Sequence, residues 1–156
     1  MQINNKRFLT FFYSIIMFSQ VSCQTKKLYF TKYESLSLEK KQEVNTYLDK
    51  VKKTYPKKDN EITLMLSYGC FLNQSVVINK KIKKEFQEIE NGEHNGKTSI
   101  INIKKDLKNI ELKFSDGKKI SISPKENYDY ISICYNKNFK EWYIEYYNYP
   151  HLNFSE

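Results

Sequence analysis

Apolar and polar residues follow three different patterns along the chain. Residues 8–18 form an almost unbroken apolar run, residues 38–54 carry apolar side chains at helical spacing, and from residue 61 onward apolar positions alternate with polar ones. A run of about 11 residues is too short to span a bilayer, helical spacing predicts an amphipathic helix, and alternation predicts half-buried strands. The pattern alone therefore divides the chain into a leader, one helix and a β-rich body.

The helical segment carries signals at both ends. Its apolar residues recur on one helical face and are Val44, Tyr47, Leu48, Val51 and Tyr55. Ser37 precedes the segment and has a hydroxyl that can accept a hydrogen bond from the first turn, while Pro56 follows it, where a helix cannot continue. We therefore predict a basic amphipathic helix and a short linker within residues 34–58.

Residues 59–156 contain short alternating runs separated by turn signals. The runs cover residues 62–68, 76–78, 82–86, 99–103, 110–114, 120–122, 128–135 and 141–147. The Asp116-Gly117 pair between two of these runs is a strong hairpin signal. Seven to eight short strands without helices between them predict a mainly β body, an antiparallel β-sandwich, preceded by the one amphipathic helix.

Residues 1–22 have the layout of a secretory signal peptide. Lys6 and Arg7 give a positive start, the apolar run follows, and small or polar residues precede Cys23. The sequence Val21-Ser22-Cys23 resembles the lipobox of bacterial lipoproteins, although Gln20 stands where that motif usually has an aliphatic residue. The resemblance implies cleavage before Cys23 and acylation of its sulfur. An ordinary cleaved signal with an incidental cysteine is the alternative.

A lipid on Cys23 places the rest of the chain outside the cytoplasm. We expect residues 23–33 to form a lipidated tether that ends in a short strand at residues 28–33. No acidic residue follows Cys23 directly, since the next residues are Gln24-Thr25-Lys26-Lys27. The expected location is the cell envelope, with the lipid in the outer membrane and the body facing the periplasm.

The net charge of the predicted mature chain is concentrated near its N-terminus. Residues 23–58 hold ten lysines and four acidic residues, whereas residues 59–156 hold fourteen of each. A nucleic-acid binder needs a basic surface on its folded body, so we predict no nucleic-acid partner. Positive charge beside the anchor favours contact with anionic headgroups, which predicts that anchor, tether and helix form one membrane-proximal unit. A solvated lysine-rich face without a partner is the alternative.

Two cysteines remain in the body, Cys70 and Cys134, and outside the cytoplasm they could pair. Alternation places Cys70 on the same strand face as Leu64 and Leu66, which are expected in the core. It places Cys134 on the face opposite to the apolar residues of its own strand. The sequence therefore favours two separate, partly buried thiols over a disulfide.

The body lacks the residue patterns of common catalytic and metal sites. No cysteine or acid completes a ligand set beside His94 or His151, so we predict no metal and no cofactor. The chain contains no Gly-x-Ser-x-Gly nucleophile motif and no phosphate-binding glycine loop. Glycoside hydrolysis would require the fold to bring two acids together, as in Asp116/Glu126 or Asp129/Glu145. We therefore predict that the protein is not an enzyme.

Five tyrosines near the C-terminus form a candidate partner-binding surface. If Ile131 and Ile133 face the core together with Trp142 and Ile144, strand parity places these tyrosines on the outer face of the last hairpin. They are Tyr128, Tyr130, Tyr143, Tyr147 and Tyr149. A tyrosine surface is large and amphipathic, as protein- and glycan-binding surfaces often are. The favoured alternative is that the amphipathic helix covers this face.

The whole sequence resembles small lipoproteins of Gram-negative bacteria, with a lipobox, a short tether and a β domain. The VVINKKI and FSDGKKISI hairpins and the closing EWYIEYYNYP strand are similar to those of a small immunoglobulin- or transthyretin-like sandwich. This resemblance implies no catalytic residues. We expect a membrane-anchored, non-catalytic binding or inhibitor/immunity-type module for a protein or glycan. A structural or assembly accessory of an envelope complex is the alternative, and an envelope hydrolase is less favoured.

Overall fold

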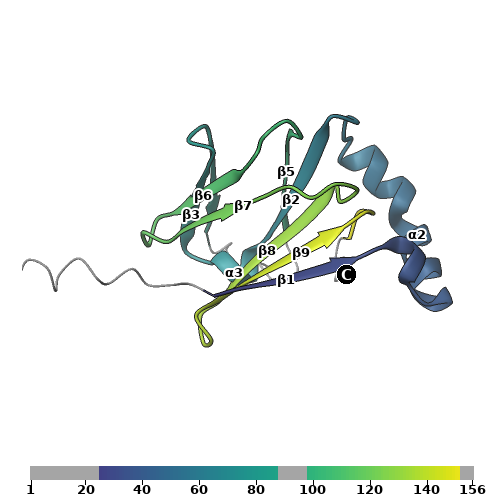
Figure 1. The fold of residues 1–156 in the computed structure, drawn as a ribbon, viewed down its shortest axis with the longest axis horizontal. Coiled ribbons are helices and arrows are strands. Elements are labelled where there is room, and N and C mark those ends of the chain that lie inside the picture. The colour runs from purple at the N-terminus through teal and green to yellow at the C-terminus, as the bar shows by residue number, and fades with distance from the viewer. Residues whose placement is uncertain (1–24, 88–97, 152–156) are drawn as a thin grey trace, which may run out of the picture.

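Two β-sheets face each other in the computed structural model, which describes residues 25–87 and 98–151, and a helix covers the outer side of the larger sheet (Figure 1). The larger sheet contains, in spatial order, β1 (Thr25–Thr31), β9 (Glu141–Tyr147), β8 (Tyr130–Asn136), β2 (Glu61–Ser67) and β5 (Thr98–Lys104). The smaller sheet contains β4 (Ile82–Phe86), β3 (Gln74–Ile78), β6 (Ile110–Phe114) and β7 (Lys119–Ile122). The helices are η1 (Tyr33–Ser35), α2 (Leu38–Thr54) and α3 (Tyr68–Phe71).

The predicted mainly β sandwich with one amphipathic helix is confirmed. Most strand pairs are antiparallel, but β1 pairs with β9 in parallel, and β2 pairs with β8 in parallel. The additional strand relative to the predicted body is β1, which precedes the helix along the chain. The helix begins where the sequence predicts, because the Ser37 hydroxyl accepts a hydrogen bond from the backbone N–H of Lys40 at 3.3 Å.

The main core lies between the two sheets. Along β9, Trp142, Ile144 and Tyr146 point into this core, and the residues between them face the other way. The Trp142 ring lies 5.1 Å from that of Phe114 in β6 and 4.8 Å from that of Tyr135 in β8. Alternate residues of strands from both sheets are therefore buried, as in other β-sandwiches.

A second core lies between α2 and the outer face of the larger sheet. Val44 and Val51 of the helix are buried there with Met65 of β2 and Tyr147 of β9. Strand β2 contributes to both cores, since Leu64 points into the main core and Met65 points towards the helix. Its five central residues are all buried, which is typical of a strand covered on both faces. The molecule is thus built of three layers, namely helix, larger sheet and smaller sheet.

Strand β1 corrects the prediction of a tether over residues 23–33. Residues 25–31 pair with β9 along their whole length, from Thr25 opposite Glu141 to Thr31 opposite Tyr147. The predicted strand at residues 28–33 is present but begins earlier in the sequence. Strand β1 therefore begins only two positions after Cys23, which itself lies outside the described residues.

A disulfide bond joins Cys70 to Cys134, which corrects the prediction of two separate thiols. That prediction extended the alternation of β2 as far as residue 70. The strand ends at Ser67, however, and Cys70 lies in the short helix α3, where strand parity no longer applies. Because α3 turns the chain beside the end of β8, the Cα atoms of the two cysteines lie 5.3 Å apart.

Reduction of this disulfide is expected to destabilise the fold. The two cysteines are 64 positions apart, and cross-linking a loop of that length lowers the entropy of the unfolded chain, which raises its free energy by about 4 kcal/mol at 25 °C. The Cys70→Ser, Cys134→Ser double variant should lose about 2–4 kcal/mol of unfolding free energy in urea titrations. The wild-type protein in dithiothreitol should show the same loss. Equal stability of the oxidised and reduced proteins would contradict the disulfide.

Candidate functional site along the β1 edge

Helix α2 covers part of the predicted tyrosine surface. Tyr147 and Tyr149 are buried in the second core, and Tyr130 is half-buried against it. The Tyr147 and Tyr149 rings meet edge to face at 5.5 Å, and the Tyr147 hydroxyl donates a hydrogen bond to Glu145 at 3.1 Å. These three side chains hold the helix on the sheet, so the alternative favoured by the sequence, coverage by the helix, applies to them.

The phenols beneath the helix stay protonated over the ordinary pH range. Burial raises the pKa of Tyr47, on α2, to about 12, and the neighbouring Tyr149 and Glu43 act in the same direction. Burial also raises the pKa values of Tyr147 and Tyr130. A neutral hydroxyl can remain in an apolar layer at lower cost than a phenolate, which suits a packing role for this group.

The other two predicted tyrosines lie away from the helix and from each other. Tyr143 is on the outer face of β9, where its ring stacks on Tyr29 of β1 at 6.1 Å. Tyr128 precedes β8, follows Asn127 at a positive φ of 65°, and packs against Tyr146 of the main core. Parity fails for Tyr128 because it lies outside the strand. The five tyrosines therefore do not form one surface.

Strand β1 is an edge of the larger sheet. It pairs with β9 on one side, and no described strand pairs with its other side. Alternate residues of such a strand direct their N–H and C=O groups away from the sheet, so β1 offers free hydrogen-bonding groups over seven residues. The side chains of six of these residues are exposed. The sequence predicts a tether for this segment, so alternation alone does not indicate the edge.

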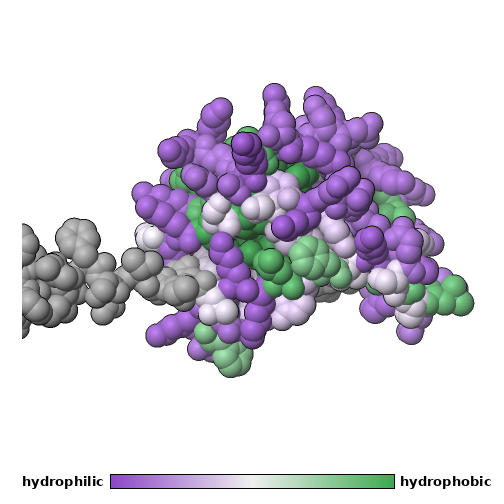
Figure 2. Space-filling model, in the orientation of Figure 1, coloured by the Kyte–Doolittle hydropathy of each residue, from purple (hydrophilic) through white to green (hydrophobic). Residues whose placement is uncertain are grey.

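Apolar side chains are exposed beside this free edge. Leu28 and Phe30 lie next to Ile144 and Tyr146 of β9 on the face that looks towards the smaller sheet, yet they are 46% and 49% exposed. The Phe30 ring stacks on that of Tyr146 at 4.9 Å. Figure 2 shows hydrophobic side chains gathered over β1 and its neighbouring strand, with hydrophilic groups on either side. We call Leu28, Tyr29 and Phe30, with the free backbone of β1, the edge site.

Lysines surround the edge site with positive charge. The strand carries Lys26 and Lys27, Lys32 follows it, and residues 25–32 contain no acid. The Lys26 ammonium donates to the backbone oxygen of Ser121 in β7 at 2.9 Å, so the β1 edge lies beside the β7 edge of the smaller sheet. Lys27 pairs with Glu141 at 2.6 Å. Lysines protect natural edge strands from aggregation, and they also favour a partner with acidic residues.

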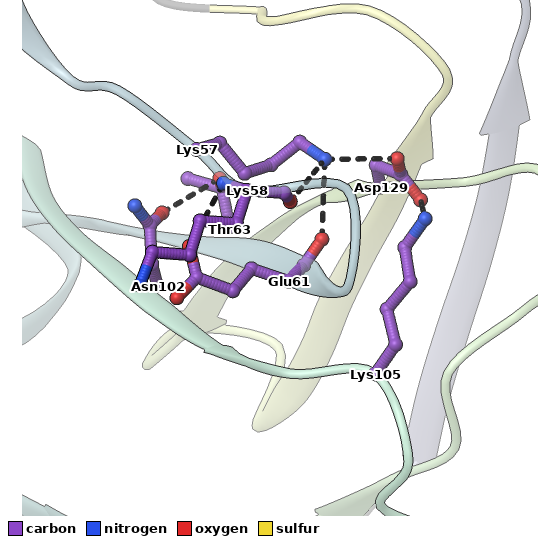
Figure 3. A network of polar contacts seen from close by, with 7 residues as sticks. All are labelled: Lys57, Lys58, Glu61, Thr63, Asn102, Lys105 and Asp129. Atoms are coloured by element: carbon purple, nitrogen blue, oxygen red, sulfur yellow. Dashed lines mark hydrogen bonds and ion pairs between the residues drawn. The ribbon is translucent and has the colours of Figure 1, made fainter.

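A polar hollow of about 760 Å³ lies at the end of the sandwich where β2 and β8 begin and β9 ends. Its lining includes three lysines and three acids, namely Lys105, Lys108, Lys125, Asp106, Glu126 and Asp129. Figure 3 shows how the Asp129 carboxylate is held: it binds Lys57 at 3.0 Å and Lys105 at 2.6 Å. Lys57 also donates to the backbone oxygen of Glu61, which fixes the linker after α2.

The acid pairs considered for glycoside hydrolysis are held in separate contacts. Asp116 pairs with Lys118 in the β6–β7 turn, whereas Glu126 lines the hollow at the opposite end. Asp129 binds two lysines, while Glu145 accepts a hydrogen bond from the hydroxyl of Tyr147. These contacts provide structural roles for Asp116, Asp129 and Glu145, and they select neither pair as acid and base.

The residues described by the structure contain no group of three or more His, Cys, Asp or Glu side chains placed to hold a metal ion. His94 lies outside the described residues. His151 stacks on Tyr147 with a ring separation of 4.4 Å, so this histidine extends the second core. Within residues 25–87 and 98–151, no helix is both long and apolar enough to cross a bilayer.

In comparisons with protein-family models, curated proteins and solved structures, nothing matches this chain. The fold and the edge site are therefore interpreted from their own geometry.

The burial of His151 predicts a pH dependence of stability. Burial lowers the pKa of its imidazole below the ordinary 6.5, although Glu145 and Glu43 act in the opposite direction. The unfolded chain thus binds the proton more readily, and unfolding free energy should fall as the pH drops below about 7, by at most about 1.4 kcal/mol per pH unit. Urea midpoints at pH 7.5, 6.5 and 5.5 measure this slope.

The two histidines of the chain provide a matched control for the pH dependence. His151→Gln should flatten the slope between pH 7.5 and 5.5, while His94→Gln should leave it unchanged. A slope that persists in His151→Gln would show that another group is responsible.

Proposed function

We propose that this protein is an exported lipoprotein, anchored through Cys23, whose β-sandwich is a non-catalytic module that binds an extended segment of a protein partner. The observation that carries the binding proposal is the edge site, where the outer side of β1 pairs with no described strand and apolar side chains are exposed. Strand addition uses the backbone groups of such an edge for affinity and the alternating side chains for selectivity.

Two features support export. The first is the signal-like layout of residues 1–22, which ends at the lipobox-like cysteine. The second is the Cys70–Cys134 disulfide, because disulfides persist in oxidising compartments outside the cytoplasm and are rare within it. The second feature lies in the folded body and is independent of the leader, so the two support the same location from different parts of the chain.

The charge of the edge site indicates the chemistry of the partner segment. Leu28 and Phe30 offer an apolar surface, and Lys26, Lys27 and Lys32 surround it with positive charge. An extended segment with apolar residues at alternate positions and acidic residues at its flanks would complement both properties. An inhibitor or immunity-type role is one form of such binding.

An assembly accessory of an envelope complex remains the second candidate. In that case the partner would be a permanent neighbour and the edge site a fixed joint between subunits. A glycan partner is less favoured for the edge site, because unpaired backbone groups arranged along a strand match another strand. The polar hollow with its three acids is where an envelope hydrolase activity would have to be sought.

Replacement of Cys23 tests the anchor. In bacterial cells fed an alkyne-tagged fatty acid, the wild-type protein should incorporate the tag, and Cys23→Ala should incorporate none. The Cys70→Ser, Cys134→Ser double variant is the control and should incorporate it as the wild type does. Wild-type protein without the tag, or tag retained in Cys23→Ala, would contradict lipidation of Cys23.

A photo-crosslinking residue tests the edge site. Placed at Leu28 in cells that produce the protein, it should form one discrete adduct with a partner protein. Placed at Leu38, which is 75% exposed at the start of α2, it should form none. Lys32→Glu should reduce the Leu28 adduct several-fold, because it opposes the negative charge expected on the partner.

The pattern of adducts decides between specific binding and simple exposure. Equal adducts at Leu28 and Leu38, or no adduct at either position, would contradict the edge site. Fractionation of the Leu28 adduct by size then separates a free partner from a subunit of a large envelope complex.

A further inference from the structure

One end of the sandwich brings together the start of β1 and two turns. Thr25 lies opposite Glu141, the first residue of β9, so the β8–β9 turn at residues 137–140 adjoins the start of β1. The β6–β7 turn at residues 115–118 lies beside them, since the Lys118 ammonium is 4.9 Å from the ring of Tyr135. We call residues 25–27, 115–119 and 136–141 the anchor end. In Figure 1 this end lies opposite to α2.

An aromatic side chain projects from the anchor end. Phe139, in the β8–β9 turn, is 69% exposed. The turn has a defined shape, because the side-chain oxygen of Asn136 accepts hydrogen bonds from the backbone N–H groups of Asn138 and Phe139 at 3.0 and 3.2 Å. Lys140 completes the turn with a positive φ of 54°. The ring is therefore presented to the outside by a closed turn.

The anchor end is also the place where positive charge gathers around that ring. Its three segments contain six lysines and two acids, a net charge of +4. The lysines are Lys26, Lys27, Lys118, Lys119, Lys137 and Lys140, and the acids are Asp116 and Glu141. Both acids are already paired with lysines, Asp116 with Lys118 and Glu141 with Lys27. Lys137 adds to this field: burial alone would raise the pKa of Asp116, but the hydrogen bonds from Lys118, together with the charges of Lys118 and Lys137, lower it.

We propose that the anchor end rests on the surface of a bilayer containing anionic lipids, with Phe139 inserted at the headgroup level. The inference rests on the proposed lipid anchor and extends it. Two residues span at most about 7 Å, so a lipid on Cys23 holds Thr25 within about that distance of the headgroups. An exposed aromatic ring gains from entering the interface, and each lysine near an anionic surface is attracted to it.

The proposal fixes the orientation of the whole molecule. Strand β1 runs away from the membrane, and its far end at Thr31 is six residue spacings or about 20 Å from Thr25. Helix α2 begins after this far end, at Leu38. The basic helix is thus held away from the bilayer, in contrast to the single membrane-proximal unit predicted from the charge distribution. The polar hollow and the linker after α2 then face the periplasmic space.

Depth measurement by fluorescence quenching tests the orientation in the full lipidated protein. Phe139→Cys and Leu38→Cys are labelled with the same environment-sensitive fluorophore; Cys70 and Cys134 are bonded to each other and Cys23 is acylated, so the new thiol is the one that reacts. In vesicles of three parts phosphatidylcholine to one part phosphatidylglycerol, brominated lipid should quench the label at 139 at least three-fold more than the label at 38. Adding Lys137→Glu and Lys140→Glu should reduce the quenching at 139.

Quenching that is equal at the two positions, or greater at 38, would overturn the proposal while leaving the lipid anchor intact. Intact mass shows whether Cys23 is acylated in the same preparation. If it is not, the anchor fails, and flotation of the unlipidated chain with the same vesicles tests the surface alone. Loss of flotation in Phe139→Ser but not in Leu38→Ser would support the anchor end as a membrane surface. Failure of the parent chain to float would overturn it.

Discussion

The larger sheet has apolar side chains on both of its faces, and burying both is the constraint on which the rest of the structure depends. A two-layer sandwich covers only one face of each sheet. The residues of β2 and β9 that point away from the smaller sheet, such as Met65 and Tyr147, need a second cover, which α2 provides. Because an uncovered face of this kind would expose several large apolar side chains, the helix is an integral layer of the fold.

This arrangement also decides which surfaces remain for partners. The aromatic residues of the C-terminal hairpin are divided between two cores and the outer face of β9, so their abundance reflects packing more than recognition. The larger sheet has one strand more than the smaller, and the excess leaves Leu28 and Phe30 partly exposed at the β1 edge. The exposure of these side chains is a consequence of sheet size. A binding surface can develop at such an edge without disturbing either core.

The sequence predicted the elements better than their arrangement. Alternation located the strands of the body, and the 3.6-residue spacing with Ser37 and Pro56 located the helix, because each pattern is local. Asn79 and Lys80, between two alternating runs, adopt positive φ angles of 49° and 59° in the β3–β4 turn, as a tight hairpin requires.

Pairing partners are non-local, and the sequence predicts them less well than it predicts the elements. Nothing in residues 25–31 specifies β9 as their neighbour, so the sequence predicts a tether where the fold has a paired strand. The disulfide was missed for a related reason, since a four-residue helix at residues 68–71 redirected Cys70. Predicting the edge site requires knowing which strand lies last in the sheet, and that order is a property of the assembled fold.

The pairing of β1 with β9 has a consequence for the order in which the molecule assembles. The first described strand joins the last, and the Tyr33 backbone N–H donates to the side chain of Asn148, 115 positions later. A chain that emerges from its N-terminus first, whether from a ribosome or through a translocation channel, therefore holds β1 unpaired until almost the whole sequence has followed. Contacts this distant close slowly, and this edge of the sheet can be completed only after β9 is available.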